Sequence, residues 1–166
     1  NPHGDDNAYF FFLMSNPELR ETFDSDKYFY INLLPSPDSH VSIDTVFWWF
    51  QHPEAQAAVR NAVLDENTAL DKFLAWIGST RGIKIWAKSP SADCVWLASA
   101  WRRNGADTTP WSYMVERDVR TAQELARSIT GKSIKDWSPD GVVHDALVDA
   151  ALQVYQVQTS FKMLKS

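Results

Sequence analysis

Residues 83–101, IKIWAKSPSADCVWLASAW, join a strand pattern directly to a helix pattern. The segment Ile83–Ala87 has the short, apolar, β-branched and aromatic character of a buried strand. Ser91 is the expected helix cap, with Asp93 in the first turn and apolar residues continuing to Trp101. A strand that leads at once into a helix is typical of α/β proteins.

The flanking segments continue this alternation of strands and helices. Further strands are predicted over residues 9–14, 27–33 and 111–115, and further helices over residues 44–50, 53–63, 67–77, 121–129 and 143–164. The last helix carries one apolar stripe, formed by Val143, Leu147, Ala150, Val154, Val157, Phe161 and Leu164. We therefore expect an α/β fold, a sheet flanked by helices, in a single domain over residues 1–166.

The composition excludes several classes of protein. The chain is 45% hydrophobic and 13% aromatic, which is too apolar for a disordered or low-complexity chain. Its one cysteine, Cys94, excludes a disulfide framework and a cysteine-based zinc site. The apolar runs, such as residues 8–14 and Val46–Phe50, are far shorter than a bilayer span. These features predict a soluble, cytoplasmic protein.

The charge is divided unevenly along the chain. The whole chain carries −5, but residues 80–135 hold 10 basic and 5 acidic side chains, a local balance of +5. A basic segment in an acidic protein can attract phosphate groups while the whole stays soluble. The alternative is a set of solvated helix faces.

Three residues could carry chemistry by acid, base or metal binding. Asp93 follows a strand and opens a helix, a position where α/β proteins place ligands. His144 stands where a loop enters the last helix, and Asp149 follows five residues later, about 140° round the helix. The alternatives are a first-turn carboxylate that complements the helix dipole for Asp93, a polar-face residue for Asp149 and an exposed loop residue for His144.

Three other residues could contact nucleic acid. Arg117 and Arg120 lie just after a predicted strand, where they could meet phosphates; in the alternative interpretation this segment, with Asp118, simply starts the next helix. Trp48 belongs to an aromatic pair that could stack on bases, although large aromatic residues are more often part of a core.

Taken in order, three segments resemble the DEDDh 3′–5′ exonucleases of the RNase H-like superfamily. The resemblance is greatest to the phage and prophage branch called exodeoxyribonuclease VIII-like or exonuclease A-like, which is also similar to RNase AS. The segments are residues 44–49 (DTVFWW), 117–121 (RDVRT) and 140–150 (DGVVHDALVDA), within a match over residues 27–160. This resemblance implies an RNase H-like mixed sheet and a hydrolase that acts on the 3′ end of DNA or RNA.

The resemblance also implies roles for the candidate residues. Four carboxylates in such enzymes hold two Mg²⁺ or Mn²⁺ ions, and Asp93 and Asp149 match two of the four. His144 matches the general base that activates the attacking water. Hard divalent ions prefer carboxylate oxygens, and an imidazole can accept a proton near neutral pH. A nucleic acid partner, no membrane and, as one assembly, a homodimer follow from the same resemblance.

The first family motif, an Asp-x-Glu pair on the first strand, has no counterpart in residues 1–166. We expect that strand to lie upstream of Asn1 or to be absent. Two hypotheses follow. The chain is part of a metal-dependent 3′–5′ exonuclease with a two-metal mechanism, or it is a catalytically decayed exonuclease-fold module that binds nucleic acid or a protein partner.

Overall fold

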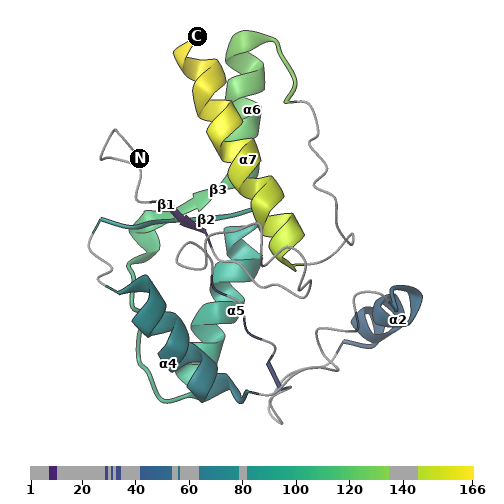
Figure 1. The fold of residues 1–166 in the computed structure, drawn as a ribbon, viewed down its shortest axis with the longest axis vertical. Coiled ribbons are helices and arrows are strands. Elements are labelled where there is room, and N and C mark those ends of the chain that lie inside the picture. Colours follow the sequence, from purple (N-terminus) through teal and green to yellow (C-terminus); the bar gives the residue numbers. More distant parts are fainter. Residues whose placement is uncertain are drawn as a thin grey trace.

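The computed structural model describes residues 8–10, 29, 31, 33–34, 42–53, 56, 64–78, 82–134 and 146–166. The elements in these ranges are β1 (Ala8–Phe10), α2 (Ile43–Gln51), α4 (Glu66–Ile77), β2 (Lys84–Ala87), α5 (Pro90–Arg103), η2 (Tyr113–Val115), β3 (Glu116–Asp118), α6 (Val119–Thr130) and α7 (Ala146–Lys165). In Figure 1 the sheet lies between the pair α4 and α5 and the pair α6 and α7, while α2 stands apart. The α/β class is confirmed.

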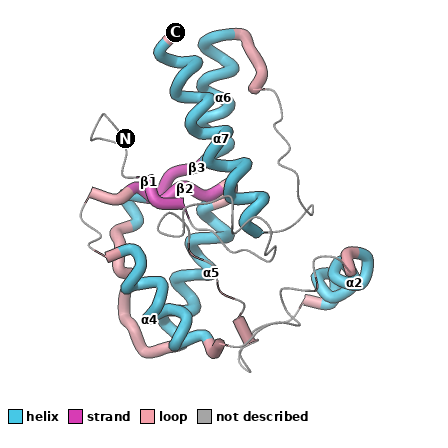
Figure 2. The backbone as a smooth tube through the Cα atoms, viewed as in Figure 1, coloured by secondary structure: helices cyan, strands magenta, loops and turns pink. Residues whose placement is uncertain are grey.

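The three described strands form one parallel sheet in the order β1-β2-β3 (Figure 2). Ile85 of the central strand pairs with Tyr9 of β1 and with Glu116 of β3. Parallel neighbours require a crossover, and α5 supplies it between β2 and β3. The described strands are all parallel, so the mixed sheet that the resemblance implies remains a prediction.

The central strand is covered on both faces, as parallel strands usually are. Ile83, Ile85 and Ala87 are buried in the core beneath α4 and α5. Trp86, between them, contacts Phe161 of α7 with ring centroids 5.9 Å apart. Alternate side chains of a strand point to opposite faces, so β2 joins the two helix pairs into one packed unit.

An aromatic cluster forms the centre of the core. Phe73 of α4 packs edge-to-face against Phe29, Trp101 and Trp111 at centroid distances of 5.4, 5.7 and 6.5 Å. Such pairs contribute about 0.5–1.5 kcal/mol each beyond the area that they bury. The cluster fixes α5 against α4, and both helices contribute residues to the candidate site.

Several predicted element boundaries are corrected by local polar contacts. The side chain of Asp65 caps α4 by accepting from the backbone N–H of Thr68 at 2.9 Å, so the helix starts at Glu66, one residue before the predicted start. The residue in the N-cap position of α5 is Ser89, not Ser91, and Pro90 follows in the first turn, where its fixed backbone suits a helix start.

The strand predicted over residues 111–115 is wrong. Ser112 accepts a hydrogen bond from the backbone N–H of Met114, which folds Tyr113–Val115 into a 3-10 turn. Trp111 enters the core and its indole donates to the Glu116 carboxylate at 3.1 Å. The strand therefore begins only at Glu116.

The apolar stripe predicted for the last helix is only partly correct. Ala150 and Val157 are buried, but Phe161 is 45% exposed, and the polar Ser160 and Gln156 are buried instead. The α7 helix packs closely on α6, where Ala126 is fully buried, so small side chains occupy this contact. The predicted strand over residues 27–33 and the predicted helix over residues 53–63 lie mostly outside the described residues. None of the described helices combines the length and apolar character that a bilayer span needs.

Candidate active site

The candidate site is built where β2 and β3 end and their helices begin. Because the two strands are parallel, their carboxyl ends meet at one edge of the sheet, the usual ligand position in α/β folds. The Arg120 guanidinium, in the first turn of α6, donates to the Lys88 carbonyl and to the Ser89 hydroxyl just before α5. This contact ties the two strand-to-helix connections together.

A cavity of about 480 Å³ opens beside this edge, a size within the usual range for ligand sites. Its walls come from α4, β2, α5 and α7. Much of the lining is apolar, including Phe29, Ile31, Leu70, Leu97 and Ala100. A few polar side chains are set in these walls: Glu66, Asp93, Arg103, Asp149 and Gln153. A mainly apolar cavity with a few polar groups is typical of a binding site.

The two carboxylates singled out from the sequence line this same cavity. Asp93 comes from the first turn of α5 and Asp149 from the first turn of α7. The two helices are far apart in the chain, so only the tertiary fold brings the two acids to one cavity. The third predicted member, His144, lies outside the described residues, as do the other residues from 135 to 145.

The surroundings of Asp93 act on the pKa of its carboxyl group in opposite directions. Burial by the surrounding protein raises the pKa of its carboxyl group, while a hydrogen bond from the Ser89 backbone and the positive charge of Arg120 oppose that rise. A partly desolvated carboxylate is stabilised by a nearby positive charge. A bound cation would therefore stabilise the ionised form of Asp93, as Arg120 already does in part.

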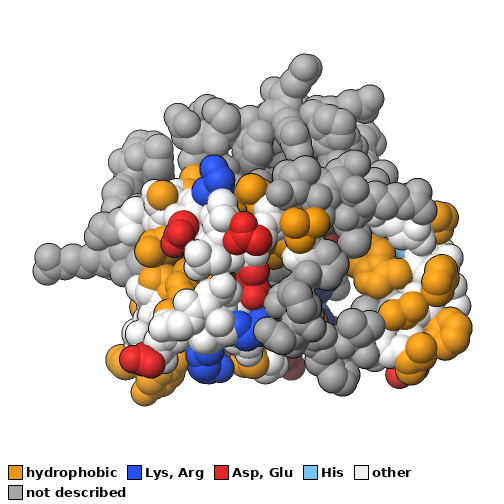
Figure 3. Space-filling model, turned by 90° about the horizontal axis from the view of Figure 1, so that it is seen from below, with side chains coloured by type: hydrophobic (Ala, Val, Ile, Leu, Met, Phe, Trp, Pro, Cys, Tyr) orange, Lys and Arg blue, Asp and Glu red, His pale blue; other side chains and the backbone are white. Residues whose placement is uncertain are grey.

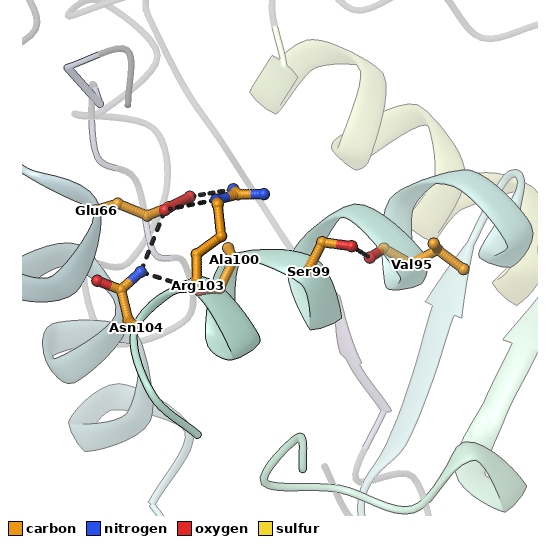
Figure 4. A network of polar contacts seen from close by, with 6 residues as sticks. All are labelled: Glu66, Val95, Ser99, Ala100, Arg103 and Asn104. Carbon is orange, nitrogen blue, oxygen red and sulfur yellow. Dashed lines mark hydrogen bonds and ion pairs between the residues drawn. The ribbon is translucent and has the colours of Figure 1, made fainter. Parts of the chain in front are cut away.

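A third carboxylate in the cavity wall, Glu66, is engaged by two partners (Figure 4). Arg103 forms an ion pair with it and donates a second hydrogen bond from Nε at 3.1 Å. The Asn104 amide donates to Glu66 at 3.1 Å and to the Ala100 carbonyl at 2.9 Å. These contacts join the start of α4 to the end of α5 and close one end of the cavity, so Glu66 has a structural role.

The predicted nucleic-acid contacts fall in different places. Neither arginine lines the cavity: Arg120 contacts Lys88 and Ser89 at the sheet edge near Asp93, and the exposed Arg117 donates to the carbonyl groups of Met114 and Glu116. The helix-start interpretation of this segment is confirmed, because Asp118 caps α6 by accepting from Arg120 N–H at 3.1 Å. Trp48 also lies outside the cavity lining, on α2, where its ring stacks on His52 with centroids 4.1 Å apart.

Cys94 lines the cavity beside Asp93 but is a poor nucleophile. The Cys94 side chain is buried. This burial raises the pKa of the thiol to about 12, with smaller contributions from the negative charges of Glu116 and Asp93. The reactive form of cysteine is the thiolate, which hardly forms at neutral pH with such a pKa. Within the part of the chain that the structure describes, no three His, Cys, Asp or Glu side chains form a metal-binding group.

Sequence reasoning missed two side chains of the cavity, Trp96 and Arg103. Both share one face of α5 with Asp93, since residues spaced by three, four and seven positions align on a helix. That spacing is visible in the sequence. Within the apolar run that follows Asp93, Trp96 is 69% exposed.

Comparison with known proteins was made at three levels. The sequence model of the 3′–5′ exoribonuclease Rv2179c-like domain family matches residues 9–161, which is most of the chain. Neither the curated proteins nor the solved structures gave a match. The exonuclease resemblance is thus confirmed at the level of the family: this chain belongs to the 3′–5′ exoribonuclease Rv2179c-like domain family.

Proposed function

We propose that the protein is a metal-dependent 3′–5′ exonuclease that removes nucleotides from nucleic acid, with RNA as the first substrate to test. The observation that carries this proposal is that Asp93 and Asp149, from two separate helices, line one cavity in a chain of an exoribonuclease family. We further propose that the chain is of the DEDDh type and acts as one domain over residues 1–166.

The donor set of the cavity suits a hard divalent cation. Asp93 and Asp149 offer carboxylate oxygens, the ligands that Mg²⁺ and Mn²⁺ prefer. When bound, a pair of such ions would stabilise the entering and leaving oxygens at phosphorus. Asp93 and Asp149 would supply half of the four carboxylates of the DEDDh type, and an Asp-x-Glu pair on a further strand would supply the rest.

The remaining residues would act on the water and on the substrate. His144, at the loop before α7, would take the proton of the attacking water. Arg120, fixed at the edge of the sheet by Lys88 and Ser89, would hold a phosphate group close to Asp93. Arg117 and Trp48 would contact the nucleic acid farther from the cavity.

The test is the shortening of a single-stranded RNA labelled at its 5′ end. We expect a ladder of products shortened from the 3′ end in Mg²⁺ or Mn²⁺, and at least about 10³-fold less product when EDTA removes the metal. A DNA strand of the same sequence compares the two substrates. The assay is run on residues 1–166 and on the chain extended by the coding sequence before Asn1.

Three results would contradict this proposal. These are cleavage that resists EDTA, internal cuts without a 3′ ladder, and no cleavage by either form of the chain. Binding of the strand without any cleavage would instead support the decayed binding module.

A further inference from the structure

We propose that Trp96 is a stacking platform for the base of the 3′-terminal nucleotide. The proposal rests on the proposed function and names a positioning and specificity residue for it. It starts from an exposed indole at a cavity that also contains both candidate acids.

One face of α5 presents a continuous strip to the cavity. The cavity is lined from this helix by Asp93, Trp96, Leu97, Ala100 and Arg103, among others. At 3.6 residues per turn these five positions fall within an arc of about 120°. Along the helix, this strip begins with the Asp93 carboxylate and continues with the Trp96 indole and the apolar side chains of Leu97 and Ala100. It ends at Arg103, which forms an ion pair with Glu66.

Trp96 is unusual because its side chain is large, apolar and open. It is 69% exposed, whereas Trp101 on the same helix is 7% exposed and Trp111 is 6% exposed in the core. An exposed indole costs hydrophobic free energy that a flat aromatic partner would recover. A nucleobase is such a partner, and stacking on an aromatic side chain tolerates any of the bases.

The spacing along α5 fits one nucleotide between the acid and the indole. Trp96 follows Asp93 by three residues, a rise of about 4.5 Å along the helix axis. Neighbouring nucleotides of a stacked strand are separated by about 3.4 Å. A phosphate held next to Asp93 would thus lie close enough to Trp96 for the base of a terminal nucleotide to reach the indole.

A different exposed apolar surface lies on α2 and is separate from this strip. Ile43, Phe47 and Phe50 there are between 59% and 72% exposed, and hydrophobic side chains gather over this helix at the right of Figure 3. They do not line the cavity that holds Asp93 and Asp149. Among the residues that the structure describes, Trp96 is therefore the exposed aromatic side chain that lines this cavity.

The experiment measures binding of a 5′-labelled single-stranded RNA whose last linkage is a phosphorothioate, followed by fluorescence anisotropy. We expect Trp96→Ala to raise the Kd by about 5- to 150-fold and Trp96→Phe to restore most of the loss. Tyr113→Ala is the matched control, because Tyr113 is 80% exposed but does not line the cavity. This control is expected to leave the Kd within about 2-fold of the wild-type value.

A strand that lacks the terminal base provides a second measurement on the wild-type protein itself. Wild type is expected to bind this abasic strand about 5- to 150-fold more weakly, and Trp96→Ala to bind both strands equally. Even if Trp96→Ala fails to fold, equal binding of the two strands by wild type would overturn the proposal.

The results separate this inference from the proposed function. If wild type shortens RNA but binds the abasic strand as tightly as the normal one, the stacking role is wrong and the nuclease role stands. If Trp96→Ala instead converts a dimer into a monomer without changing base dependence, the indole is a protein contact and the inference is overturned. If wild type neither binds nor shortens RNA, the proposed function fails and this inference fails with it.

Discussion

Asp93→Asn and Asp149→Asn are each expected to lower Mg²⁺-dependent removal of the 3′ nucleotide by at least about 10³-fold, which corresponds to about 4 kcal/mol of transition-state stabilisation. The reason is that an amide keeps the shape of the carboxyl group but not its negative charge. Both acids line the same cavity. The loss of either negative charge would therefore remove one of the carboxylate ligands of the cation that they are proposed to share. The measurement is the initial rate of 3′ shortening under saturating Mg²⁺.

Asp71→Asn is the control for both variants. Asp71 is an exposed carboxylate on α4 that does not line the cavity, so its exchange is expected to leave the rate within about 2-fold. The double variant of Asp93 and Asp149 is expected to be little worse than either single variant, because residues that act as a unit are strongly non-additive. Two independent, multiplying losses would instead show that the two acids work separately.

His144→Ala is expected to lower the rate by about 10²- to 10⁴-fold, the usual contribution of a general base. An imidazole must be neutral to accept a proton, so the wild-type rate should rise as the pH increases through the range where histidine titrates. In the variant this rise should disappear, which a lost packing contact would not cause.

His52→Ala is the matched histidine control. The His52 ring donates from Nδ1 to the Trp48 carbonyl at 2.8 Å and stacks on the Trp48 ring, outside the cavity lining. Its exchange is therefore expected to keep both the rate and the pH profile. A His144→Ala variant with the wild-type pH profile would show that another group takes the proton.

The sequence was informative about individual elements because local patterns determine them. The helix that starts after Ile83–Ala87 could be predicted from its strand-to-helix pattern. Just past its end lies Gly105, whose positive φ of 84° favours glycine. Tertiary contacts decided the rest. Trp111 lies in the core and not in a strand because it packs against Phe73 and Trp101.

The two acidic residues of the candidate site could be predicted from the sequence, but the other residues that line the cavity could not. Asp93 and Asp149 could be selected by type and by resemblance, since carboxylates at helix starts follow a known pattern. The cavity that they share depends on how α4, α5 and α7 meet, which no local spacing encodes. For the same reason, the sequence does not predict the ion pair between Glu66 of α4 and Arg103 of α5. It also does not predict that the Trp96 side chain is exposed.

Binding of Mn²⁺ by the intact protein, followed by the loss of the free Mn²⁺ signal in electron paramagnetic resonance, tests the central claim that Asp93 and Asp149 share a divalent cation. We expect saturable binding by wild type and by Asp71→Asn, and at least about 10-fold weaker binding by Asp93→Asn and by Asp149→Asn. Equal Mn²⁺ affinity in wild type and in both cavity variants would contradict the account.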